Sequence, residues 1–207
     1  MYLDTPLQNY LDDLASSQPT PGGGSAAALS GAMGAALACM VSRLTLGKAD
    51  YADVQAEIEA LVQKAEQLRA RFQQLMQADI DAYGKLSASF KLPRATAEEK
   101  AARTKAIQER LTEAALVPLE MAERAAELVQ DCLRIAQIGN TRVLSDIATA
   151  AALAVCAGNG ASWMVRVNVT SMKDQELVSK LNGRLAQALQ TLSTVSQQVK
   201  EIVEKRG

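Results

Sequence analysis

The segment with the clearest chemical potential is Pro21-Gly22-Gly23-Gly24-Ser25, which opens an uncharged run from Ala26 to Ser42. Three consecutive glycines carry no Cβ, so their backbone amides can approach a ligand or another helix closely. Ser25 is predicted to cap the helix that follows, and the free N–H groups of a helix N-terminus favour an anion. The segment therefore predicts either a binding loop or a tight connection into a buried helix.

Two carboxylates interrupt apolar patterns elsewhere in the chain. Asp79 stands one step after Leu75 in an amphipathic stretch where an apolar residue is expected, and Tyr83 follows one turn later. Asp146 is the only charged residue of Leu144–Ala157. Burial raises the pKa of a carboxyl toward the range useful for proton transfer. Two such groups can hold a cation or divide proton-transfer duties, although a structural Asp79 bonded to the tyrosine or capping a helix is the alternative.

The chain contains no histidine, which restricts its chemistry. Neither a Ser-His nor a Cys-His nucleophilic pair can form, so acid–base chemistry must use Asp, Glu, Lys, Tyr or Cys with a shifted pKa. A transition-metal site is not expected without imidazole, and no motif supports a magnesium site. We therefore predict no metal.

Composition and charge exclude further classes. With 207 residues, 48% of them apolar, the chain suits a single domain over residues 1–207. The net charge of −1, without blocks of one sign, makes a nucleic-acid surface unexpected and favours a small partner. Three cysteines without paired spacing and the absence of a secretory signal predict a cytoplasmic protein. The uncharged run is dominated by Ala, Gly and Ser, so no membrane span is expected.

Hydrophobic periodicity predicts an all-α bundle of about five long helices with a short N-terminal helix. Residues 159–172 are predicted to be irregular or briefly helical, because Val165, Val167 and Val169 alternate like a strand that has no partner. One helix of about 60 Å predicts an elongated shape, and dimerisation along its length would bury more surface. The predicted helices run from Thr5 to about Ser16, Ser25 to about Leu46, Ala52 to about Phe90, Thr96 to about Ile138, Asn140 or Thr141 to about Gly158, and from Asp174 onward.

Taken together, the motifs resemble the cyclodeaminase/cyclohydrolase family over nearly the whole chain. This family comprises the C-terminal domain of formiminotransferase-cyclodeaminase and the stand-alone methenyltetrahydrofolate cyclohydrolases. The residues that carry the resemblance are Pro19 to Ala28, Leu44-Thr45-Leu46-Gly47-Lys48, Asp79 with Ala82-Tyr83, Lys91-Leu92-Pro93, Gly139-Asn140, Ser145-Asp146 and Asn168.

The resemblance implies a homodimer that opens or closes the 5,10-methenyl ring of tetrahydrofolate, with no cofactor beyond the folate carrier. The delocalised cation of that ring suits a buried carboxylate. On this basis Asp146 and Asp79 are assigned to cation stabilisation and proton transfer, with Tyr83 orienting one of them and Lys48 as a fourth catalytic residue. The substrate-binding residues expected are Gly22, Gly23, Gly24, Ser25, Arg43, Lys91, Asn140 and Asn168, the cations among them meeting the glutamate tail.

Three functions stay open at this point. A cyclohydrolase is favoured because the sequence carries no formiminotransferase domain. A separate formiminotransferase chain could supply a cyclodeaminase, which releases ammonia as the ring closes. The third alternative is a catalytically inactive helical scaffold whose glycine loop serves packing alone. The sequence does not indicate which carboxylate is the acid and which is the base.

Overall fold

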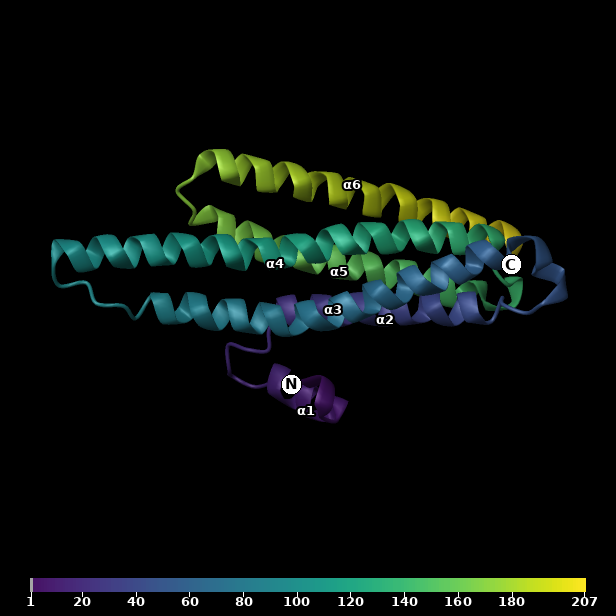
Figure 1. The fold of residues 1–207 in the computed structure, drawn as a ribbon, viewed down its shortest axis with the longest axis horizontal. Helices are drawn as coiled ribbons and strands as arrows, with labels where there is room; N and C mark the ends of the chain where they lie inside the picture. The colour runs from purple at the N-terminus through teal and green to yellow at the C-terminus, as the bar shows by residue number, and fades with distance from the viewer. Residues whose placement is uncertain (1) are drawn as a thin grey trace.

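The computed structural model describes residues 2–207 and confirms the all-α fold, with six α-helices in that part of the chain (Figure 1). They are α1 (Leu7–Leu14), α2 (Gly23–Arg43), α3 (Gln55–Ser89), α4 (Ala97–Ile138), α5 (Leu144–Thr170) and α6 (Gln175–Arg206). Short 3₁₀ turns cover Tyr2–Asp4, Ala49–Val54 and Thr141–Val143.

Helices α2 to α5 pack side by side along the long axis of the molecule, and α6 packs against α4 and α5 (Figure 1). The 42 residues of α4 make it about 63 Å long, which gives the molecule its elongated shape. Helix α1 lies outside this bundle and is joined to it by residues 15–22 (Figure 1).

Small residues let α2 and α5 approach closely. A side chain at Gly34 would lie 3.0 Å from the carbonyl oxygen of Ala150, and Gly23 lies beside Met164 near the opposite end of α5. The two helices therefore run antiparallel. As a consequence, the glycine-rich start of α2 meets the C-terminal half of α5.

The predicted N-cap of α2, Ser25, is wrong. Gly22, in an extended conformation, is the N-cap of α2, and Ser25 already lies in the first turn with no exposed surface. Ser25 cannot act as the cap because it is the third residue of the helix, where its hydroxyl donates a hydrogen bond of 2.9 Å back to the carbonyl oxygen of Gly22. The first helix also differs, since Pro6 precedes Leu7–Leu14 and Thr5 makes no capping bond.

Residues 159–170 continue α5, so the predicted helix end at about Gly158, followed by an irregular or briefly helical segment, is wrong. Val165 and Val169 are buried and stand four residues apart, whereas Val167 is 67% exposed. The alternating valines thus reflect one buried helix face, held by packing in the bundle rather than by strand pairing. The predicted starts of α4 and α6 are confirmed, since Thr96 forms a capping box with Glu99 and the Asp174 side chain caps α6.

Two segments, Gly23–Arg43 and Thr141–Thr170, are long and apolar enough to cross a bilayer by length and composition alone. This is weak evidence for a membrane protein, because core helices of a bundle have the same character. The outward side chains of these helices include Met33, Met40, Cys156 and Trp163, all of which are exposed. The two helices therefore present an uncharged outer face between residues 26–42 and 147–165.

Candidate active site

A cavity of about 340 Å³ lies where the start of α2 meets the second half of α3, the first half of α4 and the end of α5. Most of its lining is apolar, and Asp79 is the only charged residue in it. The lining residues are Pro19, Thr20, Gly22, Gly23, Gly24, Asp79, Ala82, Tyr83, Leu86, Phe90, Leu111, Ala114, Met164, Val167, Asn168 and Ser171.

The carboxyl of Asp79 lies directly against the glycine segment. A Cβ placed on Gly24 would fall 2.5 Å from Cγ and 2.6 Å from Oδ2 of Asp79, closer than real contacts allow. Gly24 is therefore required because the backbone and the carboxyl approach one another closely, not because of an unusual turn. The N-terminus of α2 also places its positive dipole end beside this negative group.

Burial raises the pKa of Asp79 to about 6, from an ordinary value of 3.8. The backbone N–H of Ser25 opposes this rise, because it favours the charged carboxylate. A carboxyl with this pKa is mostly ionised at neutral pH and can still accept and return a proton. This is the behaviour expected of a group that transfers protons.

Two further predicted residues also line this cavity. Asn168 donates hydrogen bonds of 2.8 Å from its side-chain nitrogen to the carbonyl oxygens of Ala114 and Met164. Its side-chain oxygen accepts none within residues 2–207, so it remains free for a ligand. Tyr83 is 43% exposed, and no hydrogen bond within the described chain joins its hydroxyl to Asp79. The expected orienting contact between the two is therefore not formed.

Asp146, Lys48, Asn140 and Arg43 do not reach this cavity within one chain. Asp146 lies partly exposed in the first turn of α5, 18 residues and thus about 27 Å along the helix from Met164. Within one chain, Asp146 and Asp79 therefore do not share a cavity. Arg43 forms an ion pair of 2.8 Å with Glu66, on the outside of the bundle.

Lys48 and Asn140 line a separate hollow of about 440 Å³ at the opposite end of α2. Asn140 is only 5% exposed, and its side chain is already engaged in the fold. Its Nδ2 donates to the carbonyl oxygen of Leu44 at 3.0 Å, and its Oδ1 accepts from the backbone N–H of Arg142 at 3.1 Å.

Lys91 lies in the exposed α3–α4 connection, next to the cavity residue Phe90.

The bonds of Asn140 lead to a prediction for stability. We expect Asn140→Ala to lower the free energy of unfolding by about 1 to 3 kcal/mol, because it removes both side-chain hydrogen bonds of a residue that is only 5% exposed. Denaturant titration measures this loss, and Asn182→Ala, on the exposed side of α6, is the matched control. A loss below about 0.5 kcal/mol, the range of ordinary surface substitutions, would show that these bonds do not hold the helix junction.

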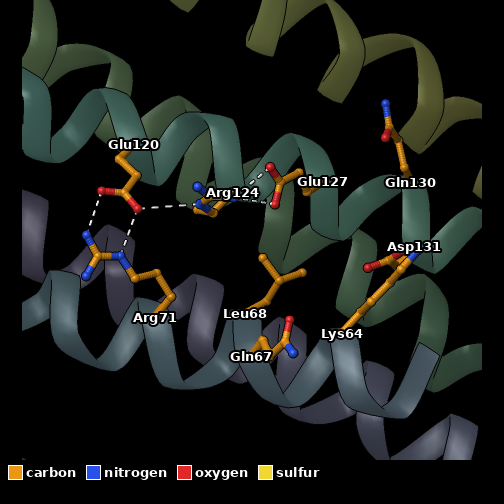
Figure 2. A pocket seen from close by; sticks show the side chains of 9 residues that line it. All are labelled: Lys64, Gln67, Leu68, Arg71, Glu120, Arg124, Glu127, Gln130 and Asp131. Carbon is orange, nitrogen blue, oxygen red and sulfur yellow. Dashed lines mark hydrogen bonds and ion pairs between the residues drawn. The ribbon is translucent and has the colours of Figure 1, made fainter. Parts of the chain in front are cut away.

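A second groove, of about 400 Å³, lies between α3 and α4 and is shown in Figure 2. Its charges are satisfied internally, with Arg71 paired to Glu120 and Arg124 paired to Glu127, each at 2.7 Å. Burial raises the pKa of Asp131 in this groove to about 6 as well. A raised pKa is therefore not what distinguishes Asp79. Its contact with a helix N-terminus in an otherwise uncharged cavity is the distinguishing feature.

Sequence reasoning missed several residues of the cavity wall, chiefly Met164 and Val167 on the last turns of α5. These turns fall in the segment that was expected to be irregular, so their face could not be assigned. Tyr10, which lies behind the cavity wall, was not predicted as part of the site either. The structure places its hydroxyl 3.1 Å from Oγ of Ser25.

The fold and the cavity together define an all-α bundle with a carboxylate-bearing small-molecule site. The family model of formiminotransferase-cyclodeaminase matches residues 6–187. The chain belongs to this family, which confirms the resemblance seen in the motifs.

Individual relatives agree with this assignment. A methenyltetrahydrofolate cyclohydrolase of Methylorubrum extorquens is 40% identical over 88% of this chain and 89% of its own length. The formimidoyltransferase-cyclodeaminase of Rattus norvegicus is 33% identical over 99% of this chain, which spans only 38% of that longer protein. The crystal structure of a formiminotetrahydrofolate cyclodeaminase from Thermotoga maritima superposes with a TM-score of 0.90 at 27% identity, covering 99% of this chain and 98% of the other.

Proposed function

We propose that this protein is a folate one-carbon enzyme that opens the 5,10-methenyltetrahydrofolate ring with water. The observation that carries the proposal is the Asp79 carboxyl, set against the α2 N-terminus in a cavity with no other charge. The methenyl bridge is a delocalised cation, so a carboxylate beside it stabilises the bound ring electrostatically. A volume of about 340 Å³ lies in the range of small-molecule sites.

In the proposed reaction, Asp79 accepts a proton from the water that attacks the bridging carbon. The addition gives a neutral tetrahedral carbon between N5 and N10. Asp79 then returns the proton to N5 as the bond between N5 and the carbon breaks, leaving a formyl group on N10. As the N5–C bond breaks, the hydroxyl on the tetrahedral carbon loses its proton to solvent and becomes the formyl C=O, so the overall change adds one water and releases one proton.

Ring closure from 5-formiminotetrahydrofolate is the second candidate, favoured by the close structural match to the Thermotoga cyclodeaminase. There N10 attacks the protonated formimino carbon, and the proton lost from N10 leaves with ammonia. The cyclohydrolase is preferred because the Methylorubrum relative is matched at higher identity and over nearly its full length. As a cyclodeaminase, the protein would act on the product of a formiminotransferase.

One assay separates these functions. The purified protein is mixed with methenyltetrahydrofolate, whose ring absorbance falls on opening, and in parallel with formiminotetrahydrofolate, from which ammonia is measured. A cyclohydrolase accelerates the first change alone, and a cyclodeaminase releases ammonia in the second. If neither occurs, a calorimetric titration with folate decides whether the cavity binds folate without turning it over. An inactive scaffold that uses its glycine loop for packing would give no heat.

We also propose a cytoplasmic homodimer in which the uncharged faces of α2 and α5 meet. These faces expose Met33, Met40 and Trp163 without a covering element in the described chain. An antiparallel pairing of two copies sets the Asp146 end of one chain beside the Asp79 cavity of the other. Such a pairing would bring together the two groups of site residues that one chain keeps apart, including Lys48 and Arg43 for the acidic folate tail.

The dimer arrangement predicts subunit complementation. We expect Asp79→Asn and Asp146→Asn each to be inactive alone, and their mixture, after dissociation and reassociation, to recover about a quarter of wild-type activity. Half of the randomly paired dimers would then be mixed, each with one intact site. Each variant reassociated with itself is the control. No recovery in the mixture would contradict a shared site, and full turnover by Asp146→Asn alone would remove Asp146 from the mechanism.

A further inference from the structure

Tyr10 is the only buried residue of α1, although it belongs to a helix outside the main bundle (Figure 1). The side chain is 1% exposed, whereas Leu7 and Leu11 on the same helix are 60% and 50% exposed. The ring of Tyr2 packs edge-on against the Tyr10 ring at a centroid distance of 5.2 Å. Tyr10 therefore anchors α1 to the bundle.

The hydroxyl of Tyr10 lies 3.1 Å from Oγ of Ser25. Because the Ser25 hydroxyl gives its own hydrogen to the carbonyl oxygen of Gly22 at 2.9 Å, the phenol must be the donor in this contact. Burial raises the pKa of Tyr10, and the charge of Asp79 adds to the rise. The phenol is thus a neutral donor close enough to sense the Asp79 carboxylate.

These contacts form a chain from α1 to the site. Tyr10 holds Ser25, Ser25 holds the N-cap residue Gly22 through its hydroxyl, and the Ser25 backbone N–H faces Asp79. Pro19 and Thr20, in the connection between α1 and α2, form part of the cavity wall. Helix α1 therefore acts on the cavity through one buried hydroxyl, whereas the connection that follows contributes to the wall directly.

We propose that Tyr10 is a positioning residue of the reaction, whose hydroxyl fixes the first turn of α2 against the Asp79 carboxyl. It does not line the cavity and does not meet the substrate. Its effect passes through Ser25 to the group that transfers the proton. The proposal rests on the proposed function for its kinetic consequence, although the geometry is independent of the substrate.

Removal of this hydroxyl has a defined consequence for Asp79. Without its donor, Ser25 is held less firmly and its backbone N–H supports the carboxylate less well, so the pKa of Asp79 rises. The other titratable side chain at the cavity is Tyr83 of α3, and α2, α4 and α5 contribute none to the lining. The acidic limb of the pH–rate profile therefore reports on this one interaction.

The test compares Tyr10→Phe with Tyr2→Phe. Both remove one phenol hydroxyl from the N-terminal segment, but the Tyr2 hydroxyl donates to Asp13 on the surface and does not reach Ser25. We expect Tyr10→Phe to lower kcat/KM for ring opening about 5- to 10-fold and to move the acidic limb up by about half a pH unit. Tyr2→Phe should leave both unchanged. Ser25→Ala should lower kcat/KM by a smaller factor in the Tyr10→Phe background than in the wild type, since the two substitutions remove the same hydrogen bond.

A measurement without substrate keeps this inference separate from the proposed function. The Asp79 carboxyl is titrated by ¹³C NMR of labelled aspartate, with Asp79→Asn used to assign the signal. A higher pKa in Tyr10→Phe than in Tyr2→Phe supports the positioning role, even if no folate is turned over. Equal pKa values in the two variants, or equal kcat/KM and acidic limbs in an active enzyme, would overturn it.

Discussion

Replacing Asp79 by asparagine is expected to lower kcat for ring opening by about 100- to 10,000-fold, the range found when a positioned proton-transfer group is removed. Asparagine has nearly the same shape, so the first turn of α2 can keep its place, but it carries neither the charge nor the transferable proton. The rate is measured from the loss of methenyl absorbance at saturating substrate. Activity within threefold of the wild type would show that Asp79 takes no part in the chemistry.

The same substitution should stabilise the fold above pH 6. The folded pKa of Asp79, about 6, exceeds the ordinary value of 3.8, so its favourable contribution is complete below pH 3.8 and is lost as the pH rises through 6. Asp79→Asn should therefore unfold at higher denaturant than the wild type at pH 8, whereas at pH 3.5 this advantage should be absent. Loss of activity with gain of stability is the combination expected of a functional carboxylate.

Asp131→Asn is the matched control for this experiment. Burial raises the pKa of Asp131 to about 6 too, but this residue lies in the α3–α4 groove of Figure 2 and has its loose partner Lys64 at 3.9 Å. We expect Asp131→Asn to show a similar pH-dependent change in stability and to keep full turnover. The two substitutions thus separate burial of a carboxyl from its use in the reaction.

Gly24→Ala is expected to lower kcat/KM by about 100-fold or more, because the added methyl group occupies the space of the Asp79 carboxyl. Either the carboxyl or the first turn of α2 must move, and overpacking of this kind costs about 1 to 3 kcal/mol of stability. Kinetics and thermal unfolding measure the two effects.

Gly84→Ala is the control for Gly24→Ala. Gly84 lies on α3, the helix that carries Asp79, and a side chain there meets nothing within 4 Å. Alanine should keep activity and add about 0.5 to 1 kcal/mol of stability, since glycine is unfavourable inside a helix. If Gly24→Ala behaved like Gly84→Ala, the close contact between Gly24 and Asp79 would not matter for function.

The sequence predicted the central pair of this site because both members break a local rule. Asp79 stands where the three-four spacing of Leu75 and its neighbours calls for an apolar residue, and Gly22 to Gly24 open a helix with residues that disfavour helices. Both features lower the stability of the fold on their own, and the structure shows Gly24 in contact with the Asp79 carboxyl. Asn168 was proposed from the family resemblance alone and also lines the cavity.

The position of Asp146 could not be predicted in the same way. Periodicity shows which face of a helix is buried, but it does not show which ends of two helices meet. The antiparallel packing of α2 and α5 puts the end of α5 at the cavity and its first turn, with Asp146, about 27 Å away. The role of Tyr10 was hidden for a similar reason, since its bond to Ser25 joins a peripheral helix to the core across 15 residues.

The location of bound folate tests the central claim most directly. A crystal structure of the protein with a stable reduced folate carrying its one-carbon group at N5 would show that location. We predict that the folate lies against Gly22 to Gly24, with its N5 region within hydrogen-bond reach of the Asp79 carboxyl, about 2.6 to 3.2 Å or through one water. Folate bound in the α3–α4 groove, or in the hollow beside Lys48 without approaching Asp79 of either chain, would contradict this account.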